Sequence, residues 1–297
     1  MLHCLDKKFW KLLMDSRKIN LSKFTTYKFG GLAEQFFTIK DESDIDYLTN
    51  FVNLEQYFIL GKGSNVVFAD HDHAYPIINP NLNSLKTLQN SNYLRIGSGV
   101  YLPELARYLK SNNLTGGEYM LGIPGSVGGA FCMNAGCYGY EFFDNLVSAK
   151  IFDFKSNSIK EIQKKDINYG YRFNSLSDYL LLSVDMTFNE DTTENINKKL
   201  SKYNKLRRDA QPPAIYNAGS VFKNGENYFA GELIEKAGLK GYRLEDVAVS
   251  EKHANFFIAD KGAKAINLFK LVNYVKSKVY DKFDVVLQEE IIFIGEF

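Results

Sequence analysis

The glycine-rich segment GIPGSVGGAFCMNAGCYGYE at residues 122–141 constrains this chain more than any other feature. Six of its twenty residues are glycine, but Pro124, Met133 and Asn134 are not typical of a flexible linker, a strand or a helix. Small residues at 125–130 let main-chain N–H groups approach a bulky ligand, and neutral Asn134 can add a hydrogen bond. The segment therefore indicates a backbone surface for a ligand, with a tightly packed structural turn as the alternative.

Three standard motifs are excluded for this segment. A P-loop requires Gly-Lys-Ser/Thr, and no lysine occurs between Lys110 and Lys150. A nucleophile elbow requires Gly-x-Ser-x-Gly, but Pro124 occupies the first position around Ser126. A metal site requires several His, Cys or carboxylate ligands, and the segment offers two cysteines and one glutamate. The remaining interpretation is that the segment binds a ligand through its backbone groups.

A second glycine-rich turn, LGKGSN, occupies residues 60–65. Its consecutive amides can form an anion-binding nest. Val66 stands where a dinucleotide fingerprint needs its third glycine, and a strand rather than a helix is expected to follow. Taken alone, the turn is as consistent with a β-hairpin as with a phosphate cradle. Two such turns in one chain favour a phosphate-bearing cofactor.

Composition narrows the class of protein. The 297 residues are 45% hydrophobic, which is sufficient for one large or two smaller globular domains. A formal net charge of +1 provides no basic field, so no nucleic-acid partner is expected. Apolar runs are far shorter than the ~20 residues of a membrane span, and the first residues do not resemble a signal peptide. We expect no membrane association, a cytoplasmic location and, with three cysteines, neither disulfides nor a metal site.

The hydrophobic periodicity favours an α+β fold, because strands and helices follow one another without a regular βαβα repeat. A domain boundary is expected near residue 200, where the composition becomes polar and helix-prone. The expected helices cover residues 7–17, 103–112, 191–209, 229–239 and 263–280, and the expected strands cover residues 56–60, 66–69, 93–96, 147–154, 159–162, 180–188, 255–259 and parts of 284–294.

Polar residues outside the glycine turns are candidates for chemistry. Arg172, flanked by aromatics in YGYRFNS, can hold a carboxylate or a flavin ring. Ser220 follows a glycine in NAGSVFKN, with Lys223 and Asn224 close behind as candidate pyrophosphate ligands. Burial can raise the pKa of Glu290 in LQEEIIFIG. The simpler interpretations are a surface salt bridge for Arg172, a turn serine for Ser220 and a strand-edge carboxylate for Glu290.

The histidines are expected to have structural roles. His253 is expected to be a hydrogen-bonded structural residue, and His71 and His73 are expected to lie on an exposed turn.

The motifs TTYKFGG, LGKGSN, LGIPGSVGGAFCMNAGCYGYE, YRFNS, GSVFKN and LQEEIIFIG occur in this order from residue 25 to residue 295. In order and spacing the series resembles the UDP-N-acetylenolpyruvoylglucosamine reductase family of flavoproteins, known as MurB. The resemblance implies a two-lobed FAD-binding domain of the vanillyl-alcohol-oxidase (PCMH) type and a C-terminal α+β substrate domain. With it we expect a helical lead-in at 1–22, an FAD-binding domain at 23–195 with lobes 23–75 and 76–195, and a substrate domain at 200–297.

The resemblance also implies an activity: FAD and NADPH serve the reduction of a UDP-linked enolpyruvyl amino sugar to UDP-N-acetylmuramate during peptidoglycan synthesis. Arg172 and Glu290 match the residues that stabilise the enolate, and Ser220 matches the proton donor. Tyr171, Lys223 and Asn224 are the expected substrate contacts. The expected FAD contacts are Gly61, Lys62, Gly63, Ser64, Asn65, Gly122, Ile123, Pro124, Gly125, Ser126, Gly128, Gly129, Ala130, Asn134, Ala135 and Gly136.

The short path from YRFNS to GSVFKN indicates the compact form of the family, without a substrate-covering insertion, and a monomer is expected. Three places depart from the family pattern: Gly225 replaces a proline, Ile292 replaces a common arginine, and Glu245-Asp246 falls where glycine is frequent. Two alternatives remain. One is a flavin oxidase of the same fold that acts on an alcohol or amine, and the other is a non-catalytic protein that binds flavin or a nucleotide sugar.

Overall fold

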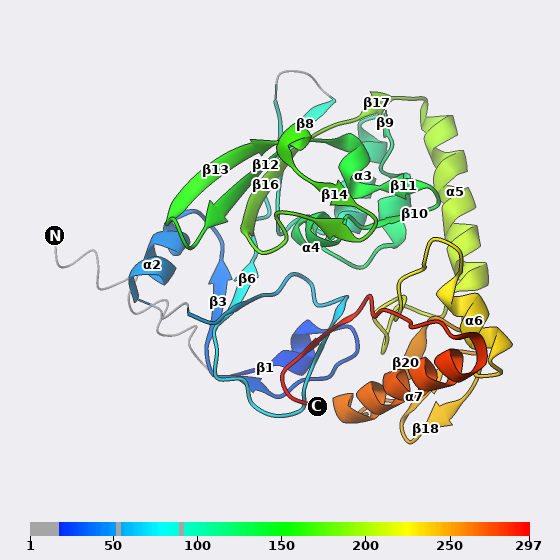
Figure 1. Cartoon of the computed structure of the whole chain (residues 1–297). Coiled ribbons are helices and arrows are strands. Elements are labelled where there is room, and N and C mark those ends of the chain that lie inside the picture. The colour runs from blue at the N-terminus through cyan, green and yellow to red at the C-terminus, as the bar shows by residue number, and fades with distance from the viewer. Residues whose placement is uncertain (1–17, 52–54, 89–91) are drawn as a thin grey trace. The chain divides into compact units, whose positions relative to one another are not determined.

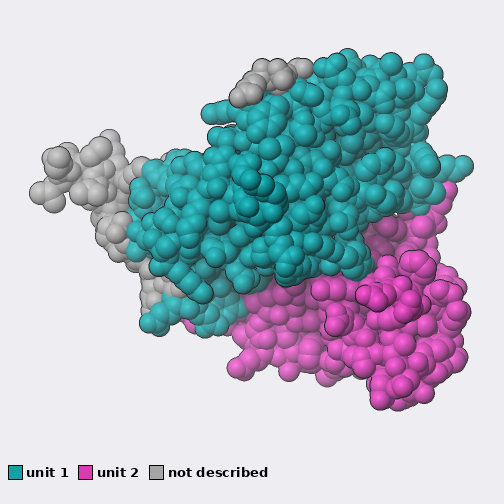
Figure 2. All heavy atoms as spheres, turned by 45° about the horizontal axis from the view of Figure 1, so that its top comes forward, with its two compact units in different colours: residues 1–17, 35–62, 75–206 teal, residues 18–34, 63–74, 207–297 magenta. Residues whose placement is uncertain are grey.

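The computed structural model describes residues 18–51, 55–88 and 92–297 (Figure 1). Most of the expected lead-in helix, up to residue 17, lies outside the described residues. The described chain forms two compact units, coloured separately in Figure 2. Unit 1 holds residues 35–62 and 75–206, and unit 2 holds residues 18–34, 63–74 and 207–297. These units follow spatial packing, and the domain limits given above remain a prediction.

A five-stranded antiparallel sheet organises unit 1, with the order β13-β12-β16-β8-β7. Figure 1 shows its three longest strands side by side. Strand β16 is buried along seven of its eight residues because it lies in the middle of the sheet, whereas β13 is an edge strand and largely exposed. The strands expected at 93–96, 147–154, 159–162 and 180–188 are confirmed as β8 (Tyr93–Gly97), β12 (Leu146–Asp153), β13 (Ser158–Gln163) and β16 (Leu180–Thr187), joined by β7 (Leu85–Thr87).

Helices α3 (Leu102–Ser111) and α4 (Val127–Met133) share one hydrophobic core with this sheet. Helix α3 starts where predicted, because Pro103 lies in its first turn and lacks the N–H that a helix interior needs. Leu105 and Leu109, one helical turn apart, are buried. Short 3-10 helices at Glu118–Gly122 and Phe142–Asn145 flank α4 in sequence.

The remainder of unit 1 contains a parallel sheet and three short antiparallel strand pairs, of which β10–β11 and β14–β15 are hairpins. The parallel sheet has the order β3-β6-β4, and the long helix α5 begins in this unit, close to its predicted range. The strands of the parallel sheet are β3 (Phe36–Ile39), β4 (Phe58–Ile59) and β6 (Ile77–Pro80), and the helices are α2 (Ser43–Phe51) and α5 (Thr193–Ala210). The short strand pairs are β9 (Leu114–Thr115) with β17 (Asn189–Glu190), β10 (Gly136–Cys137) with β11 (Tyr140–Glu141), and β14 (Tyr169–Gly170) with β15 (Phe173–Asn174). A one-turn 3-10 helix covers Lys164–Asp166.

Unit 2 packs helices α6 (Ala230–Lys236) and α7 (Ala265–Phe283) against the antiparallel sheet β18-β19-β20. Helix α7 buries Leu268, Leu271 and Val275 on one face, the spacing from which the sequence predicted it. The strands are β18 (Arg243–Leu244), β19 (Val247–Val249) and β20 (Phe257–Ala259), with the pairs β1 (Ile19–Asn20) and β2 (Leu32–Ala33), and β5 (Val66–Phe68) and β21 (Ile292–Ile294). A 3-10 helix at Leu21–Phe24 follows β1.

One alternative is excluded and two expectations are wrong. His73, which was expected on an exposed turn, is only 1% exposed because its ring packs against Phe68. The turn at 60–65 is not a β-hairpin, because β4 pairs in parallel with β6 whereas β5 pairs in parallel with β21 at the far end of the chain. The strands expected across 284–294 are reduced to β21. The segment before β21 makes only an isolated bridge, Phe222 with Glu289, because it approaches residues 221–223 over too short a length for a ladder.

Candidate active site

The two glycine-rich turns meet within unit 1. A Cβ placed on Gly61 would lie 2.9 Å from Ser126 Oγ and 3.8 Å from the backbone nitrogen of Gly129. Asn79 of β6 holds the first turn, since its Nδ2 donates to the carbonyls of Leu60 (2.6 Å) and Gly61 (3.1 Å). In this part of the turn, therefore, glycine is required by close contact with the second turn.

The start of α4 presents small residues and backbone. Ser126 is the N-cap, and its Oγ accepts from the backbone N–H of Gly129 at 3.3 Å. Gly128 donates to the carbonyl of Ser98 at 2.8 Å, and a Cβ on Gly128 would lie only 3.1 Å from that oxygen. The hydroxyl of Ser98 is buried and has no hydrogen-bond partner among the described residues.

These features fit a phosphate-bearing cofactor. The backbone amides of Gly61, Lys62 and Ser126 donate to no acceptor in the described part of the chain, so they remain available to a ligand. The lining is neutral backbone rather than carboxylate, and the backbone carbonyl and Cβ of Ser98 lie against Gly128 in this lining. Among the predicted cofactor residues, Gly63, Ser64 and Asn65 belong to unit 2, whereas Gly61, Lys62 and all those from 122 to 136 belong to unit 1.

Asn134 ends α4 in the left-handed conformation, with φ of 39°. Its side chain is fully buried and makes three hydrogen bonds within the protein. Nδ2 donates to Glu141 Oε2 at 2.7 Å and to the carbonyl of Gly170 at 3.0 Å, and Oδ1 accepts from the N–H of Phe143 at 3.1 Å. Both of its amide hydrogens thus have protein acceptors, so a contact between its side chain and FAD stays only a prediction.

Arg172 lies at the tip of the β14–β15 hairpin, whose loop consists of Tyr171 and Arg172. Its φ of 55° is left-handed, which is uncommon for a residue other than glycine. The guanidinium donates to the carbonyls of Gly136 (3.1 Å) and Asn134 (3.5 Å) and lies 4.9 Å from the centre of the Tyr171 ring. The guanidinium is therefore held by two backbone carbonyls and by a cation–π contact with the ring of Tyr171.

Ser220 and Glu290 lie on neighbouring segments of unit 2. The backbone N–H of Glu290 donates to the carbonyl of Val221 at 2.7 Å, and its own carbonyl accepts from Asn65 Nδ2 at 2.9 Å. Ser220 forms an isolated antiparallel bridge with Phe256. Both residues are half-buried. Two of the three predicted catalytic residues are thus brought together in one unit, and Arg172 belongs to the other.

Asn255 is a site residue that the sequence did not single out. It is 3% exposed, and its side chain makes two hydrogen bonds with the backbone of Phe222: Oδ1 accepts from the N–H at 3.0 Å and Nδ2 donates to the carbonyl at 2.8 Å. His253 Nδ1 in turn accepts from the N–H of Asn255 at 3.2 Å, as expected for a structural histidine. Burial, and then the charge of Lys240, lower the pKa of His253. An asparagine between a histidine and two phenylalanines was the available signal.

The predicted substrate contacts in unit 2 follow Ser220 directly. The backbone N–H of Lys223 donates to the carbonyl of Gln288 at 2.8 Å. Asn224 Oδ1 accepts from the N–H of Ala230 at the start of α6, at 3.0 Å. A Cβ on Gly225 would lie 2.3 Å from the ring of Tyr228, which explains why glycine suits this position in place of the family's proline.

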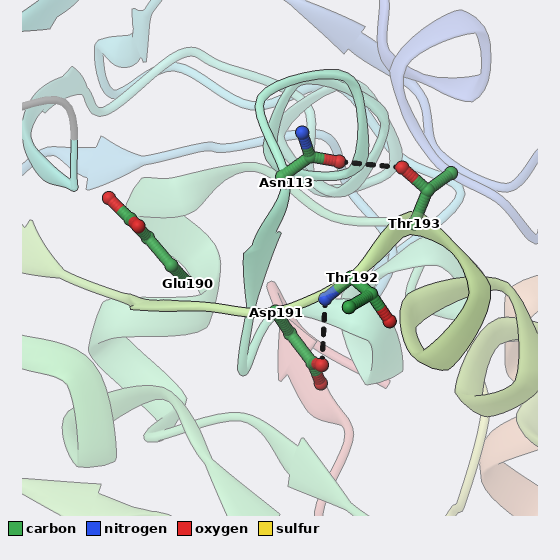
Figure 3. A pocket seen from close by; sticks show the side chains of 5 residues that line it. All are labelled: Asn113, Glu190, Asp191, Thr192 and Thr193. Atoms are coloured by element: carbon green, nitrogen blue, oxygen red, sulfur yellow. Dashed lines mark hydrogen bonds between the residues drawn. The ribbon is translucent and has the colours of Figure 1, made fainter.

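A polar pocket at the start of α5 is a separate feature (Figure 3). Thr193 Oγ1 donates to Asn113 Oδ1 there at 2.7 Å. Hydrogen bonds from Asn195 and Lys199 lower the pKa of Asp191 to about 2, so its carboxylate is ionised at neutral pH and would repel a phosphate. No predicted site residue lines it, and we do not assign the cofactor to it. Its lining consists of Asn113, Glu190, Asp191, Thr192 and Thr193.

Two absences hold for the described residues. No group of three or more His, Cys, Asp or Glu residues there is arranged to hold a metal ion. None of the helices in this part of the chain combines the length and the apolar composition that crossing a bilayer requires.

Two protein families match this chain in succession. Residues 33–162 match the FAD binding domain family, and residues 211–294 match the C-terminal domain of UDP-N-acetylenolpyruvoylglucosamine reductase. Together with the backbone-lined turn, these matches define the class of protein: an FAD-dependent oxidoreductase with a PCMH-type FAD-binding domain and a separate C-terminal domain.

Whole-length relatives give the particular family. The UDP-N-acetylenolpyruvoylglucosamine reductase of Prochlorococcus marinus is 35% identical over 284 residues, which cover 94% of this chain and 96% of the relative. That of Rickettsia prowazekii is 36% identical over 282 residues, covering 94% and 95%. The crystal structure of the reductase (MurB) from Thermus caldophilus has a TM-score of 0.82 at 28% identity and covers 94% of this chain and 98% of the other. The chain belongs to the UDP-N-acetylenolpyruvoylglucosamine reductase (MurB) family.

Proposed function

We propose that this protein reduces the enolpyruvyl group of UDP-N-acetyl-3-O-(1-carboxyvinyl)-glucosamine to give UDP-N-acetylmuramate, with NADPH as reductant, during peptidoglycan precursor synthesis. The observation that carries the proposal is the union of an FAD-binding domain and this reductase's C-terminal domain in one chain that aligns with 96% of a curated relative. We further propose that it acts as a cytoplasmic monomer.

The cofactor fits the first glycine turn and the start of α4. The free amides of Gly61, Lys62 and Ser126 would donate to FAD, and the small residues from 125 to 130 would let it approach the backbone. Gly63, Ser64 and Asn65, which belong to unit 2, are proposed as further cofactor contacts. Bound FAD supplies the hydride, and the protein supplies position and electrostatics.

Arg172 and Glu290 are proposed to stabilise the charge that develops on the substrate. An enolpyruvyl group is a carbon–carbon double bond conjugated to a carboxylate, so hydride addition at its terminal carbon builds negative charge toward that carboxylate. Fixed donors that need no reorganisation are the most effective stabilisers of such charge. Arg172 is held in this way by two carbonyls, and Glu290 would contribute as a protonated donor.

Ser220 is proposed to donate the proton to the adjacent carbon. A hydroxyl is a weak acid, but an enolate-like carbon is a strong base, so the transfer is reasonable if the hydroxyl is well placed. The bridge between Ser220 and Phe256, and the bonds from Asn255 to Phe222, fix the backbone around it. Lys223, Asn224 and Tyr171 are proposed to contact the rest of the substrate.

Substituting Ser220 by alanine tests this proposal. In stopped-flow absorbance measurements, flavin reduction by NADPH should change little, whereas re-oxidation by the enolpyruvyl nucleotide should slow by ~10²-fold or more, because only the second half-reaction needs the proton. Ser201→Ala, an exposed position on α5, is the control and should leave both rates unchanged. Equal loss in both half-reactions would show that Ser220 has a structural role.

The same apparatus separates the alternatives. If NADPH bleaches the flavin of the unaltered protein but the enolpyruvyl nucleotide does not restore its absorbance without oxygen, the proposed reaction is wrong. Rapid anaerobic reduction by an alcohol or amine would instead identify a flavin oxidase. Binding of the nucleotide sugar with no flavin turnover at all would identify a non-catalytic protein.

A further inference from the structure

We infer that Asn134 is a positioning residue for Arg172, not a ligand of the cofactor, and that it acts through the short helix α4 and the β14–β15 hairpin. The inference rests on the proposed function, because it concerns how the arginine proposed to stabilise the enolate is held. All of the groups involved belong to unit 1.

Asn134 acts on Arg172 in two ways. Its own backbone carbonyl accepts from the guanidinium at 3.5 Å, beside the stronger bond from Arg172 to Gly136 at 3.1 Å. Its side chain donates to the carbonyl of Gly170, two residues before the arginine, at 3.0 Å. One residue thus holds both the tip of the arginine side chain and the hairpin from which that side chain extends.

The left-handed backbone of Asn134 is necessary for this arrangement. At φ of 39° the chain turns sharply after α4, so that the carbonyls of Asn134 and Gly136 both face Arg172. Asparagine tolerates this conformation better than most residues with a side chain. The third contact, Oδ1 with the N–H of Phe143, ties the turn to the segment that follows β11.

A second asparagine holds the other strand of the hairpin. Asn174, 1% exposed, donates through Nδ2 to the carbonyls of Phe131 (2.6 Å) and Cys132 (3.1 Å), which are among the last of α4. Both strands of the hairpin are therefore bonded to the C-terminal end of the helix whose N-terminal end carries Ser126 and Gly129. A residue that only bound the cofactor would not need these contacts.

The chemistry explains why an arginine needs this support. Arginine has a long side chain with several rotatable bonds, and its use against a developing carboxylate charge depends on a fixed direction. Asn134 has no free amide hydrogen to offer a ligand, because Glu141 and Gly170 accept both. Its contribution to the reaction must then pass through Arg172.

The test uses Asn134→Gly in the full-length holoprotein, because glycine keeps the left-handed backbone and removes only the side chain. We expect re-oxidation of the flavin by the enolpyruvyl nucleotide to slow by ~10-fold or more, while the rate of flavin reduction by NADPH and the Kd for FAD each change by less than ~3-fold. Hydrogen exchange of the peptide spanning residues 168–175 should become faster.

A double-mutant cycle distinguishes positioning from general damage. In an Arg172→Ala background, Asn134→Gly should slow re-oxidation by less than ~2-fold, because the residue it positions is already gone. Asn157→Gly is the matched control: Asn157 has φ of 47°, is exposed and lies in the β12–β13 turn of the same unit. It should leave every rate, and exchange at 168–175, unchanged.

Two results would overturn the inference. One is an Asn134→Gly protein whose Kd for FAD rises as much as its re-oxidation rate falls, which would make Asn134 a cofactor ligand. The other is an effect of equal size with and without Arg172. If Asn134→Gly does not fold, Asn174→Ser should give the same pattern from the other strand, and an additive result there would equally count against the hairpin mechanism. Failure of the unaltered protein to turn over would instead refute the proposed function.

Discussion

Arg172 and Ser220 are held in different ways. Arg172 lies in a two-residue loop with a left-handed backbone, and side-chain amides and backbone carbonyls fix both the loop and the guanidinium. Ser220 lies in an extended segment that is bridged to Phe256, and the next residue but one is clamped by Asn255. The difference follows from side-chain length: a serine hydroxyl is placed once its backbone is placed, whereas an arginine needs separate contacts at its tip.

The comparison predicts where damage to each anchor should appear. Loss of an anchor in the Ser220 segment should appear first as lost stability, because that anchor is buried backbone bonding in the core of unit 2. Loss of the contacts that the Arg172 side chain itself makes should appear first as lost activity, because the aromatic side chains of the hairpin are largely exposed.

Asn255→Ala should have the largest effect. Both backbone groups of Phe222 would lose their partners in a buried site, and each unsatisfied group costs roughly 1–3 kcal/mol, so we expect the free energy of unfolding to fall by about 3 kcal/mol. Urea denaturation followed by circular dichroism measures it. Asn273→Ala on the exposed face of α7 is the control. A loss below about 1 kcal/mol would mean that the segment is held by its backbone bridges alone.

Arg172→Lys should have a smaller effect, and on activity alone. Lysine keeps the charge but cannot donate in the planar geometry that reaches the carbonyls of Asn134 and Gly136, so re-oxidation of the flavin should slow by ~10²-fold, equivalent to about 2.7 kcal/mol. The free energy of unfolding should change by less than about 0.5 kcal/mol. Arg208→Lys, at a largely exposed side chain, should change neither quantity. A large loss of stability would contradict the comparison.

Acid should weakly destabilise unit 2, which contains both His253 and His73. Burial lowers the pKa of His253 in the folded protein, so as pH falls below about 6.5 the unfolded chain takes up the proton first and stability decreases. We expect the contribution of this residue to be small, because the half-exposed ring is screened by solvent. His253→Asn, which retains an acceptor for Asn255, should flatten the decrease in denaturation curves between pH 7.5 and 5.5.

His73 contributes in the same direction, since burial lowers its pKa as well. The His253→Asn protein should therefore keep part of the pH dependence, and His73→Asn should remove a further part. An unchanged slope in His253→Asn would show that His253 does not titrate within this range. The described residues of unit 1 contain no histidine, so the Arg172 hairpin should not share this sensitivity.

Much of the fold follows from local sequence patterns. Helix α3 begins at the position that Pro103 favours, helix α5 lies where the composition becomes polar and helix-prone, and helix α7 and strands β12, β13 and β16 lie where periodicity predicts them. These elements are long, so their hydrophobic pattern repeats often enough to identify each one as a helix or a strand. The meeting of the two glycine turns was also indicated, because both suggested the same ligand.

Long-range pairing and side-chain direction could not be predicted in this way. The partner of β5 is β21, more than 200 residues away, so the sequence left a hairpin open as one of two interpretations of the turn at 60–65. Asn134 is predicted to contact the cofactor because it lies in the glycine-rich segment, and the sequence does not tell which way its buried amide points. The available signal was its place after a helix: asparagine there is typical of a left-handed C-cap, a structural role.

Helix α4 also limits how this gene can change in length. Its seven residues rise about 10 Å, with Ser126 at one end and the turn that faces Arg172 at the other. One inserted or deleted residue would rotate one end against the other by about 100° and shift it by about 1.5 Å. Insertions can accumulate in exposed connections such as the β12–β13 turn. Between Ser126 and Asn134, an insertion or deletion would misplace one end of α4 relative to the other, so we expect none to be tolerated there.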